Sequence, residues 1–322
     1  MSSRRIGVVM DPIAQISPAK DSSLAMLLES QGRGHDILYF EQGNLRVIDG
    51  EPWGIGRALT VTDDPHRWFE LGEPVDAKLA NLDVILMRKD PPFDTEYIYT
   101  TYILERAELQ GVIVINRPAS LRDINEKAFT AWFPECCPPT LITRSMQQLR
   151  KFLAEHGRIV VKPMHGMGGR SIFVVDQSDN NANVIFETLT DYEARFTIGQ
   201  RYVPEISAGD KRILLVDGEP AAHALARIPA PDDYRGNLVA GALPEVRDLT
   251  ERDRWICSQV GPVLAERGVV FAGLDVIGDY LTEINVTSPT GIRELSKLAD
   301  IDVAADLFDC IERKIISAKA AA

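Results

Sequence analysis

Three segments of this chain are apolar over nearly their whole length, and they constrain its fold more than any other feature. The three are Arg5–Met10, Asp36–Phe40 and Leu82–Met87. A strand with one solvated face would alternate apolar and polar residues, so uniformly apolar strands are typical of a parallel sheet covered on both faces. Between the first two segments, Asp21 and Ser22 offer an N-cap for a helix that ends near Gly32 and Gly34. This order predicts a β-α-β unit.

The rest of the first 122 residues continues the same α/β pattern. Its further predicted elements are a hairpin over 44–60 around Asp49-Gly50, an amphipathic helix over Thr95–Gln110 and a fourth strand over Val112–Asn116. The charged segment 88–92 follows the third strand, and open α/β sheets bind ligands at the carboxyl ends of their strands. A GxGxxG motif does not follow the first strand, so a dinucleotide fingerprint is absent. We predict an α/β, doubly wound parallel-sheet domain here.

A glycine-rich loop marks a change of pattern in the second part of the chain. The predicted elements around it are a linking helix over Ser120–Phe133, a helix over Arg144–His156, and strands over Arg158–Pro163 and Ile172–Val175. The loop between the two strands contains Gly166, Gly168 and Gly169. A Walker loop would end in Gly-Lys-Ser/Thr and open a helix, whereas the backbone of this loop can close over phosphates as a flap. Lys162, at the end of the first strand, can meet a phosphate; an ordinary glycine-rich hairpin is the alternative.

Charged residues also lie within strands that should otherwise be apolar. Lys211–Val216 and Pro220–Arg227 are predicted to pair across a turn at Asp217-Gly218. Arg212 and Arg227 belong to these strands, and arginines on strands are usually paired with a carboxylate or a phosphate.

The segment Ile228–Arg247 is long and rich in turns, and a connection of this length is usually a functional loop. Arg235 and Asn237 form its polar centre. The remaining predicted helices are Glu251–Arg267 and Ile301–Ile315, with a frayed tail after the second.

A β-hairpin within Phe271–Arg293 is the third candidate site. Its strands, joined by a Gly-Asp turn, are Gly273–Ile277 and Tyr280–Asn285. Glu283 and Asn285 point from one face of the second strand, and Asp275 can lie across from them. An all-oxygen set with one neutral amide suits Mg²⁺, while a surface hairpin with solvated acids is the alternative.

Composition excludes several classes of function. The chain has 322 residues and a net charge of −12, which argues against a nucleic-acid-binding protein because such a protein needs a basic surface. No apolar run approaches the ~18 residues that a membrane span requires. The four cysteines, Cys136, Cys137, Cys257 and Cys310, show no zinc spacing. Scattered thiols without an export signal are typical of the reducing cytoplasm, where we expect this protein.

Taken together, these segments resemble an ATP-grasp ligase, and more closely the bacterial glutathione synthetase family. The likeness lies in VMDPIA, LMRKDPPFDTEYIYTTYILERAE, NRPASLRDINEKAFTAWF, VKPMHGMGG, GDKRILLVDGEP, ARIP, RGNL and LTEINVTSPTGIRE. It covers about residues 5–295, and the tail after Glu294 matches poorly. It implies a substrate-side domain over 1–122 and an ATP-grasp α+β domain over 123–322, whose small lobe covers about 123–203 and whose large lobe covers 204–322.

The resemblance also implies roles for single residues. ATP would be held by Lys127, Lys162, Gly166, Gly168, Gly169, Gln200, Tyr202, Val203 and Lys211. Mg²⁺, or Mn²⁺ in its place, would be held by Asp275, Glu283 and Asn285. The substrate γ-glutamylcysteine, or its activated form, would be bound by Arg212, Arg227, Arg235, Ser288 and Thr290, and the three arginines would also be catalytic. Without the resemblance, Lys127 would be taken for a solvated helix charge.

The implied reaction joins γ-glutamylcysteine to glycine at the expense of ATP, through an acyl phosphate, in a homo-oligomer that is a tetramer or a dimer. Such chemistry needs positioning and charge neutralisation rather than a nucleophilic triad. Leu243 departs from the pattern, because the family carries an arginine there, and this puts loop closure and substrate affinity in doubt. The alternatives are another ATP-grasp carboxylate-amine ligase and a non-catalytic nucleotide-binding protein with a decayed site.

Overall fold

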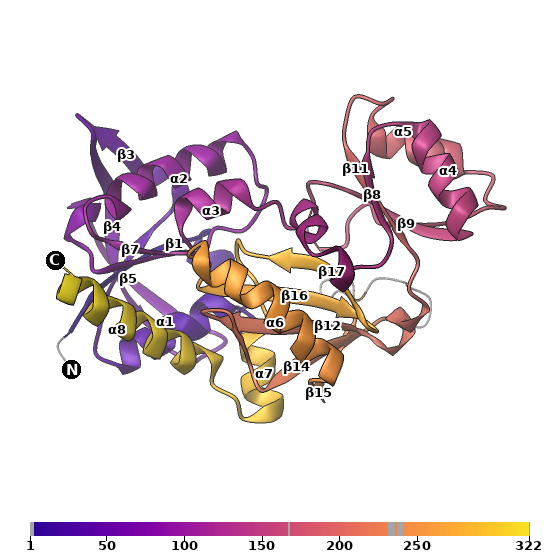
Figure 1. Cartoon of the computed structure of the whole chain (residues 1–322). Coiled ribbons are helices and arrows are strands. Elements are labelled where there is room, and N and C mark those ends of the chain that lie inside the picture. The colour runs from indigo at the N-terminus through magenta and orange to yellow at the C-terminus, as the bar shows by residue number, and fades with distance from the viewer. Residues whose placement is uncertain (1–2, 167, 231–235, 237–240, 322) are drawn as a thin grey trace.

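The computed structural model describes residues 3–166, 168–230, 236 and 241–321. Figure 1 shows three regions: the N-terminal sheet on the left, the sheet of β12, β14, β16 and β17 in the centre, and a small lobe with α4 and α5 on the right. The C-terminal helix α8 (Val303–Ala321) runs beside α1 (Ser22–Gly32), so both ends of the chain lie on the N-terminal side (Figure 1).

The N-terminal sheet has seven strands in the order β3-β4-β2-β1-β6-β7, with β5 paired to β4. The strands are β1 Arg5–Val9, β2 Asp36–Phe40, β3 Leu45–Ile48, β4 Glu51–Val61, β5 Phe69–Lys78, β6 Val84–Met87 and β7 Ile113–Ile115. β2, β1, β6 and β7 are parallel, as the apolar segments predicted. β3 to β5 form an antiparallel extension, which confirms the hairpin over 44–60. β5 was not predicted, because it is mostly exposed and has no buried pattern.

Helices cover both faces of this sheet (Figure 1), with α1 and α8 on one side and α2 (Thr95–Glu108) and α3 (Pro118–Asp123) on the other. Asp21 caps α1 as predicted, since its side chain accepts a hydrogen bond from Leu24 N at 2.7 Å. The sheet is therefore doubly covered, as a parallel sheet requires.

The linking segment differs from the helix predicted over Ser120–Phe133. After α3, a 3-10 turn, η4 (Ala128–Trp132), begins only beyond Lys127. The Asn125 side chain explains the break, because its Oδ1 accepts hydrogen bonds from Lys127 N at 3.1 Å and Ala128 N at 2.9 Å. Local bonds of this kind compete with helix formation. Lys127 is thus held in a turn and is not a solvated helix charge.

The small lobe is a four-stranded antiparallel sheet in the order β10-β9-β11-β8. Its elements are β8 Thr140–Thr143, α4 Met146–His156, β9 Arg158–Pro163, β10 Phe173–Asp176, α5 Ala182–Thr190 and β11 Thr197–Arg201. β9 and β10 are antiparallel neighbours, with Val161 opposite Phe173, so the glycine-rich loop joins two paired strands as predicted.

The large lobe is a six-stranded sheet in the order β15-β14-β12-β16-β17, with β13 paired to β12. Its elements are β12 Asp210–Val216, β13 Glu219–Pro220, β14 His223–Ile228, β15 Leu243–Asp248, α6 Glu251–Glu266, β16 Phe271–Ile277, β17 Tyr280–Asn285 and α7 Ile292–Ala299. Both predicted hairpins are present.

Three details of this lobe correct the sequence-based predictions. The loop predicted over Ile228–Arg247 is shorter, because Leu243–Asp248 forms β15 and pairs with β14. The predicted frayed tail is wrong, since α8 continues to Ala321. The helix α7 was not predicted. None of the described helices combines the length and apolar character needed to cross a bilayer.

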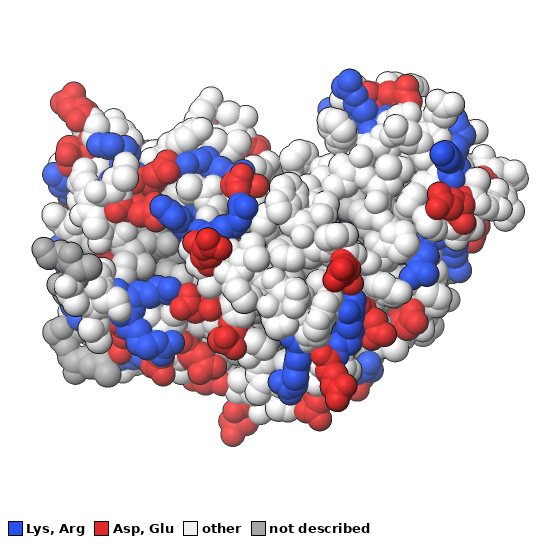
Figure 2. All heavy atoms as spheres, viewed as in Figure 1, with Lys and Arg blue, Asp and Glu red and all other residues white. Residues whose placement is uncertain are grey.

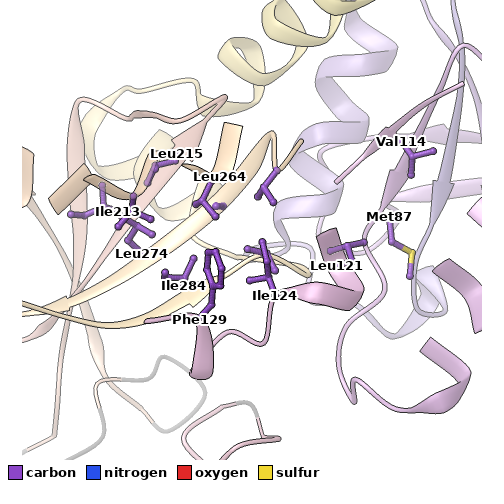
Figure 3. Close-up of a cluster of buried hydrophobic side chains, with 14 of the residues drawn as sticks. Met87, Val114, Leu121, Ile124, Phe129, Ile213, Leu215, Leu264, Leu274 and Ile284 are labelled. Atoms are coloured by element: carbon purple, nitrogen blue, oxygen red, sulfur yellow. The ribbon is translucent and has the colours of Figure 1, made fainter. Parts of the chain in front are cut away.

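A continuous hydrophobic core joins the N-terminal sheet to the large-lobe sheet. Its members in Figure 3 include Met87, Val114, Leu121, Ile124, Phe129, Ile213, Leu274 and Ile284. A second shared core contains Val8, Leu27, Leu214, Phe271 and Phe308. The small lobe has a separate core, built around Leu149, Val161 and Phe186. The N-terminal region and large lobe are therefore packed as one body, while the small lobe packs largely on itself.

Charged side chains are distributed over the face of the molecule that Figure 2 presents. Figure 2 shows basic and acidic groups interspersed on the face it presents, over both the N-terminal region and the small lobe. The excess of acidic residues is therefore not gathered into one patch on that face.

Candidate active site

A cavity of about 330 Å³ lies where the small lobe faces the large-lobe sheet and the loop after β6. The predicted site residues that line it are Lys127, Lys162, Gly166, Gly168, Gly169, Gln200, Tyr202, Val203, Arg212, Arg227, Asp275, Glu283, Asn285, Ser288 and Thr290. Lys211 is not part of the lining, and Arg235 lies outside the described residues. The fold thus brings together three segments that the sequence singled out separately.

Lys127 and Lys162 bring two ammonium groups to this cavity in different surroundings. Lys127 Nζ donates hydrogen bonds to Glu283 Oε1 at 2.8 Å and to Gly166 O at 2.9 Å. Burial disfavours its charge, but Glu283 outweighs this and raises the pKa of Lys127. Lys162 is 8% exposed and makes no ion pair with a described residue, and burial lowers its pKa. A buried ammonium group without a carboxylate partner suits a phosphate.

The glycine-rich loop has the backbone that a flap over phosphates requires. Gly168 and Gly169 have φ angles of 68° and 74°, in the left-handed region. A side chain there would add about 1–2 kcal/mol of steric strain. Gly166 O accepts the hydrogen bond from Lys127, which fixes one end of the loop.

Arg212 and Arg227 are bound to carboxylates, as expected of arginines on strands. Arg212 Nε donates to Asp275 Oδ1 at 2.5 Å, and its Nη2 donates to Oδ2 at 3.0 Å. Arg227 Nη2 lies 2.9 Å from Asp275 Oδ2 and 2.6 Å from Asp210 Oδ2. Burial opposes the charge on Asp275, but the two arginines hold its pKa well below its usual range. Burial raises the pKa of Asp210 to about 7, against the opposing effect of Arg227.

The candidate metal ligands lie on β16 and β17, and Asp275 is the cross-strand partner of Glu283, as predicted. Asn285 Nδ2 donates a hydrogen bond to Gly273 O at 3.2 Å. The amide nitrogen is therefore bound to the backbone, and the amide oxygen is the atom that would bind a metal. Two carboxylates and one amide oxygen fit a hard divalent cation. Among the described residues, no group of three or more His, Cys, Asp or Glu side chains is arranged to hold a metal ion. A cation here would therefore rest on this mixed set together with the substrate phosphates.

Lys211 differs from its expected role. Successive residues of a strand point to opposite faces, so Lys211 faces away from the cavity that Arg212 lines. Its Nζ lies 2.5 Å from Oδ1 of Asp253, a fully buried residue on α6. Lys211 thus anchors α6 to the sheet, and we exclude it from the ATP site.

Part of the cavity lining is apolar and suits a flat base. This part includes Pro138, Val160, Ile172, Val174, Ile206 and Ile277. Gln200 Nε2 donates to Thr140 Oγ1 at 3.2 Å, and the Tyr202 ring lies 4.2 Å from the Arg158 guanidinium carbon. β11 ends at Arg201, so Tyr202 and Val203 follow the strand and do not belong to it.

The loop after β17, residues 286–291, forms part of the cavity wall, and Glu126 supports it. Glu126 Oε1 accepts hydrogen bonds from Val286 N at 3.1 Å, Thr287 N at 3.2 Å and Thr287 Oγ1 at 2.8 Å. Burial, together with the nearby Glu283, raises the pKa of Glu126. Glu126 was not predicted from the sequence as a site residue, although its position beside Lys127 was a signal.

The N-terminal region supports the same loop through residues that were not predicted individually as site residues. Ser288 Oγ donates to Asp90 Oδ1 at 2.5 Å, and Arg88 Nη2 donates to Pro289 O at 3.0 Å. Thr290 O accepts from Arg212 Nη1 at 3.4 Å. The charged segment at the carboxyl end of β6 was the signal for Arg88 and Asp90.

Leu243, where an arginine was expected, is the first residue of β15 and pairs with Ile228. Its side chain is 71% exposed. It adjoins β14, the strand that carries Arg227, but it does not line the cavity.

Two family models match the chain. The prokaryotic glutathione synthetase N-terminal domain matches residues 5–122, and the prokaryotic glutathione synthetase ATP-grasp domain matches residues 126–300. The chain belongs to the prokaryotic glutathione synthetase family. Among the relatives of this glutathione synthetase family member, the glutathione synthetase of Pseudomonas putida is 57% identical over 311 residues, which cover 97% of this chain and 98% of that protein. The glutathione synthetase of Yersinia pestis is 54% identical over 317 residues, which cover 98% and 99%.

Solved structures share the fold at much lower identity. D-cycloserine synthetase DcsG has a TM-score of 0.69 at 16% identity, over 97% of this chain and 99% of that chain. The ATP-grasp ligase PsnB, complexed with minimal precursor, Mg and ADP, has a TM-score of 0.62 at 15% identity, over 96% and 98%. The predicted fold class, an α/β N-terminal domain followed by an ATP-grasp domain, is confirmed. As an ATP-grasp ligase of the glutathione synthetase family, this protein uses ATP with a divalent metal ion.

Proposed function

We propose that this enzyme joins the cysteinyl carboxylate of γ-glutamylcysteine to the amine of glycine, giving glutathione, ADP and phosphate. The observation that carries the proposal is that one cavity gathers a glycine flap, a carboxylate-amide set, two arginines and a buried lysine that forms no ion pair with a described residue. A carboxylate is a poor electrophile, so the γ-phosphate of ATP is first transferred to it. Glycine's amine then attacks the acyl phosphate, and phosphate leaves.

The phosphate groups of ATP would lie against Lys162 and Lys127, under the glycine-rich loop. Lys162 supplies a cation that the described protein does not neutralise, and the loop supplies backbone N–H donors. The apolar side near Gln200, Tyr202 and Val203 would receive the adenine. This arrangement supports positioning and charge neutralisation as the source of catalysis.

Asp275, Glu283 and Asn285 would hold the metal, and their oxygen donors favour Mg²⁺, with Mn²⁺ as the alternative. When bound, the cation would neutralise charge on the transferring phosphate. The protein holds its own part of this site in place, since Arg212 and Arg227 orient Asp275, and Lys127 orients Glu283. Such support keeps the ligand oxygens positioned before substrate binds.

Arg212 and Arg227 would bind the oxygens of the substrate carboxylate and of the acyl phosphate formed from it. Both are buried in the cavity wall, where guanidinium groups give strong, directional hydrogen bonds to oxyanions. Ser288 and Thr290 would contact the dipeptide from the loop after β17. Arg235 keeps its proposed substrate and catalytic role on family resemblance alone. Closure of the small lobe would exclude water from the acyl phosphate.

We further place the enzyme in the cytoplasm as a dimer or tetramer. Its four cysteines are free and buried, which suits a reducing compartment. Val47, Ile48, Ile55 and Val75 on the antiparallel extension of the N-terminal sheet are nearly half exposed, and association would cover them. Sedimentation at several concentrations tests the assembly.

Phosphate release from ATP tests the proposed reaction, with γ-glutamylcysteine and glycine added singly and together. We expect release only when both are present, and almost none from the Lys162→Met variant. Release that requires neither or only one of them would contradict the proposal. Release with a different carboxylate and amine would favour another ATP-grasp ligase activity.

A further inference from the structure

Asp90 differs from the other acidic residues of the cavity. The lining contains Asp90, Glu126, Asp210, Asp275 and Glu283. Asp210, Asp275 and Glu283 are ion-paired with arginine or lysine, and Glu126 accepts three hydrogen bonds on one oxygen. Asp90 Oδ1 accepts a hydrogen bond from Ser288 Oγ at 2.5 Å, and no cation of a described residue lies within 4.0 Å of its carboxylate.

The two basic residues beside Asp90 in the chain are committed elsewhere. Arg88 donates to Ser23 Oγ and Pro289 O, both at 3.0 Å. Lys89 Nζ lies 2.8 Å from Asp11 Oδ1 and donates to the backbone oxygen of Asp90 at 2.7 Å. The Asp90 carboxylate therefore lines the cavity without an ion pair to a cation of its own segment, although the buried Arg88 lies close enough for the two charges to interact.

The proposed substrate carries a cation that could pair with the Asp90 carboxylate. The cavity's lysines and arginines suit phosphates and carboxylates, but a γ-glutamyl dipeptide also carries an α-ammonium group. We propose that Asp90 and Ser288 form the subsite for the α-ammonium group of the glutamyl residue, an inference that rests on the proposed function. Ser288 donates its proton to Asp90, so its oxygen lone pairs accept from the ammonium group, while the carboxylate supplies the charge.

Glycine's amine fits this subsite less well. That amine must lose its proton before it attacks, and a neighbouring carboxylate favours the protonated form. The glutamyl ammonium group takes no part in the reaction and stays charged throughout. The position of Asp90 agrees with a role away from the reacting groups. Asp90 belongs to the N-terminal region, while the proposed metal ligands and Lys127 lie on or beside β16 and β17.

Both members of the subsite are held in place. Asp90 N donates to Asp11 Oδ2 at 2.9 Å, which fixes the backbone that carries the carboxylate. The Arg88 hydrogen bond to Pro289 O fixes the residue after Ser288. Side chains that are oriented before binding lose little conformational entropy when the ligand arrives.

A substrate lacking only the ammonium group tests this subsite. Glutarylcysteine has the same chain and carboxylates as γ-glutamylcysteine, without the α-amine. For the wild-type enzyme we expect its KM to be about tenfold higher, equivalent to about 1.4 kcal/mol for one charge-assisted contact. The Asp90→Asn variant, which can still accept from Ser288, should show the higher KM for γ-glutamylcysteine and an unchanged KM for glutarylcysteine.

Asp94→Asn is the matched control, because Asp94 lies outside the cavity, at the N-cap of α2, where Asn is an equally good cap. It should discriminate between the two dipeptides like the wild type. The subsite is wrong if Asp90→Asn raises both KM values equally, changes neither, or instead raises the KM for glycine. Calorimetric binding of both dipeptides in the presence of ADP repeats the comparison without turnover. The proposed function fails separately, if the wild-type enzyme turns over neither dipeptide.

Discussion

Lys162 and Lys127 line the same cavity, but their surroundings shift the pKa of their ammonium groups in opposite directions. The ion pair with Glu283 raises the pKa of Lys127. Burial lowers the pKa of Lys162, which forms no ion pair with a described carboxylate. A cation with a lowered pKa loses its proton at a lower pH than an ordinary lysine. Lys162 is therefore the residue whose charge should limit ATP binding at alkaline pH.

The pH dependence of kcat/KM for ATP checks this expectation, since it reports groups of the free enzyme. We expect an alkaline limb below the ordinary lysine pKa of about 10.4. Lys162→Arg should move this limb to higher pH, because a guanidinium group stays protonated. An alkaline limb that is identical in wild type and variant would assign the titration to another group.

Asp275 and Asn285 are expected to differ in what they contribute to stability. Asp275 neutralises two buried arginines, so Asp275→Asn should lower the free energy of unfolding by about 3 kcal/mol, besides abolishing turnover.

Asn285→Ala should lower turnover by about 100-fold and change stability little, because its one described hydrogen bond is long. Urea denaturation and the Mg²⁺ dependence of turnover check both. Unchanged Mg²⁺ dependence in Asn285→Ala would contradict its role as a metal ligand.

At the scale of elements, the loop after β17 depends on groups that lie far away in the chain. Glu126 holds its start, Asp90 and Arg88 hold its middle, and Ser22 Oγ accepts hydrogen bonds from Gly291 N at 3.1 Å and Ile292 N at 3.2 Å. The wall of the cavity that we propose for the dipeptide is therefore positioned largely by residues of the N-terminal region, although the loop itself belongs to the large lobe.

Arg88→Met should separate the two substrates. The variant removes the bond to Pro289 O while leaving the ATP side of the cavity intact, so we expect the KM for γ-glutamylcysteine to rise about tenfold, by the ~1.5–3 kcal/mol typical of a hydrogen bond to a charged group. The KM for ATP should not change. Steady-state kinetics with each substrate varied in turn measure both. An equal rise in the two KM values, with a lowered melting temperature, would indicate general loss of structure instead.

Leu243→Arg tests the departure from the family pattern. The side chain at this position is exposed on the edge strand β15, next to the strand that carries Arg227, so an arginine would fit without disturbing the core. We expect a lower KM for γ-glutamylcysteine or faster turnover. No change in either would show that the missing cation is compensated or unimportant.

The elements themselves could be predicted where their patterns are local. The hairpin at 271–285 has β-branched strands and a Gly-Asp turn, and the structure reproduces it with Asp275 opposite Glu283. Lys211 was misplaced because family resemblance was followed without applying strand alternation, which sends it to the face opposite Arg212. β5 and β15 were missed because edge strands are exposed and lack an apolar pattern.

At the scale of the whole molecule, the arrangement of cores separates the small lobe from the rest. The N-terminal region and the large lobe share two cores, while β9 and β10 pack within the third. Sequence patterns cannot show this division, because it depends on contacts such as Asn116 Nδ2 with Phe271 O, between residues 155 positions apart. For the same reason the roles of Asp90 and Arg88 appeared only in the folded protein.

Hydrogen exchange should show the small lobe opening as a separate unit. Amides of β9 and β11 should exchange through an opening that leaves β1 and β16 protected, since these belong to the shared cores. ADP at 100 times its dissociation constant should slow exchange in the lobe by about 100-fold. Simultaneous exchange of all three regions would contradict separate packing.

We propose that phosphate is transferred from ATP to the dipeptide carboxylate within this one cavity. The most direct measurement uses γ-glutamylcysteine labelled with ¹⁸O in both oxygens of its cysteinyl carboxylate, with ATP and glycine, and determines the label in the released phosphate by mass spectrometry. An acyl phosphate intermediate predicts one ¹⁸O atom in each phosphate released. Phosphate without ¹⁸O, formed at the same rate as glutathione, would contradict the account.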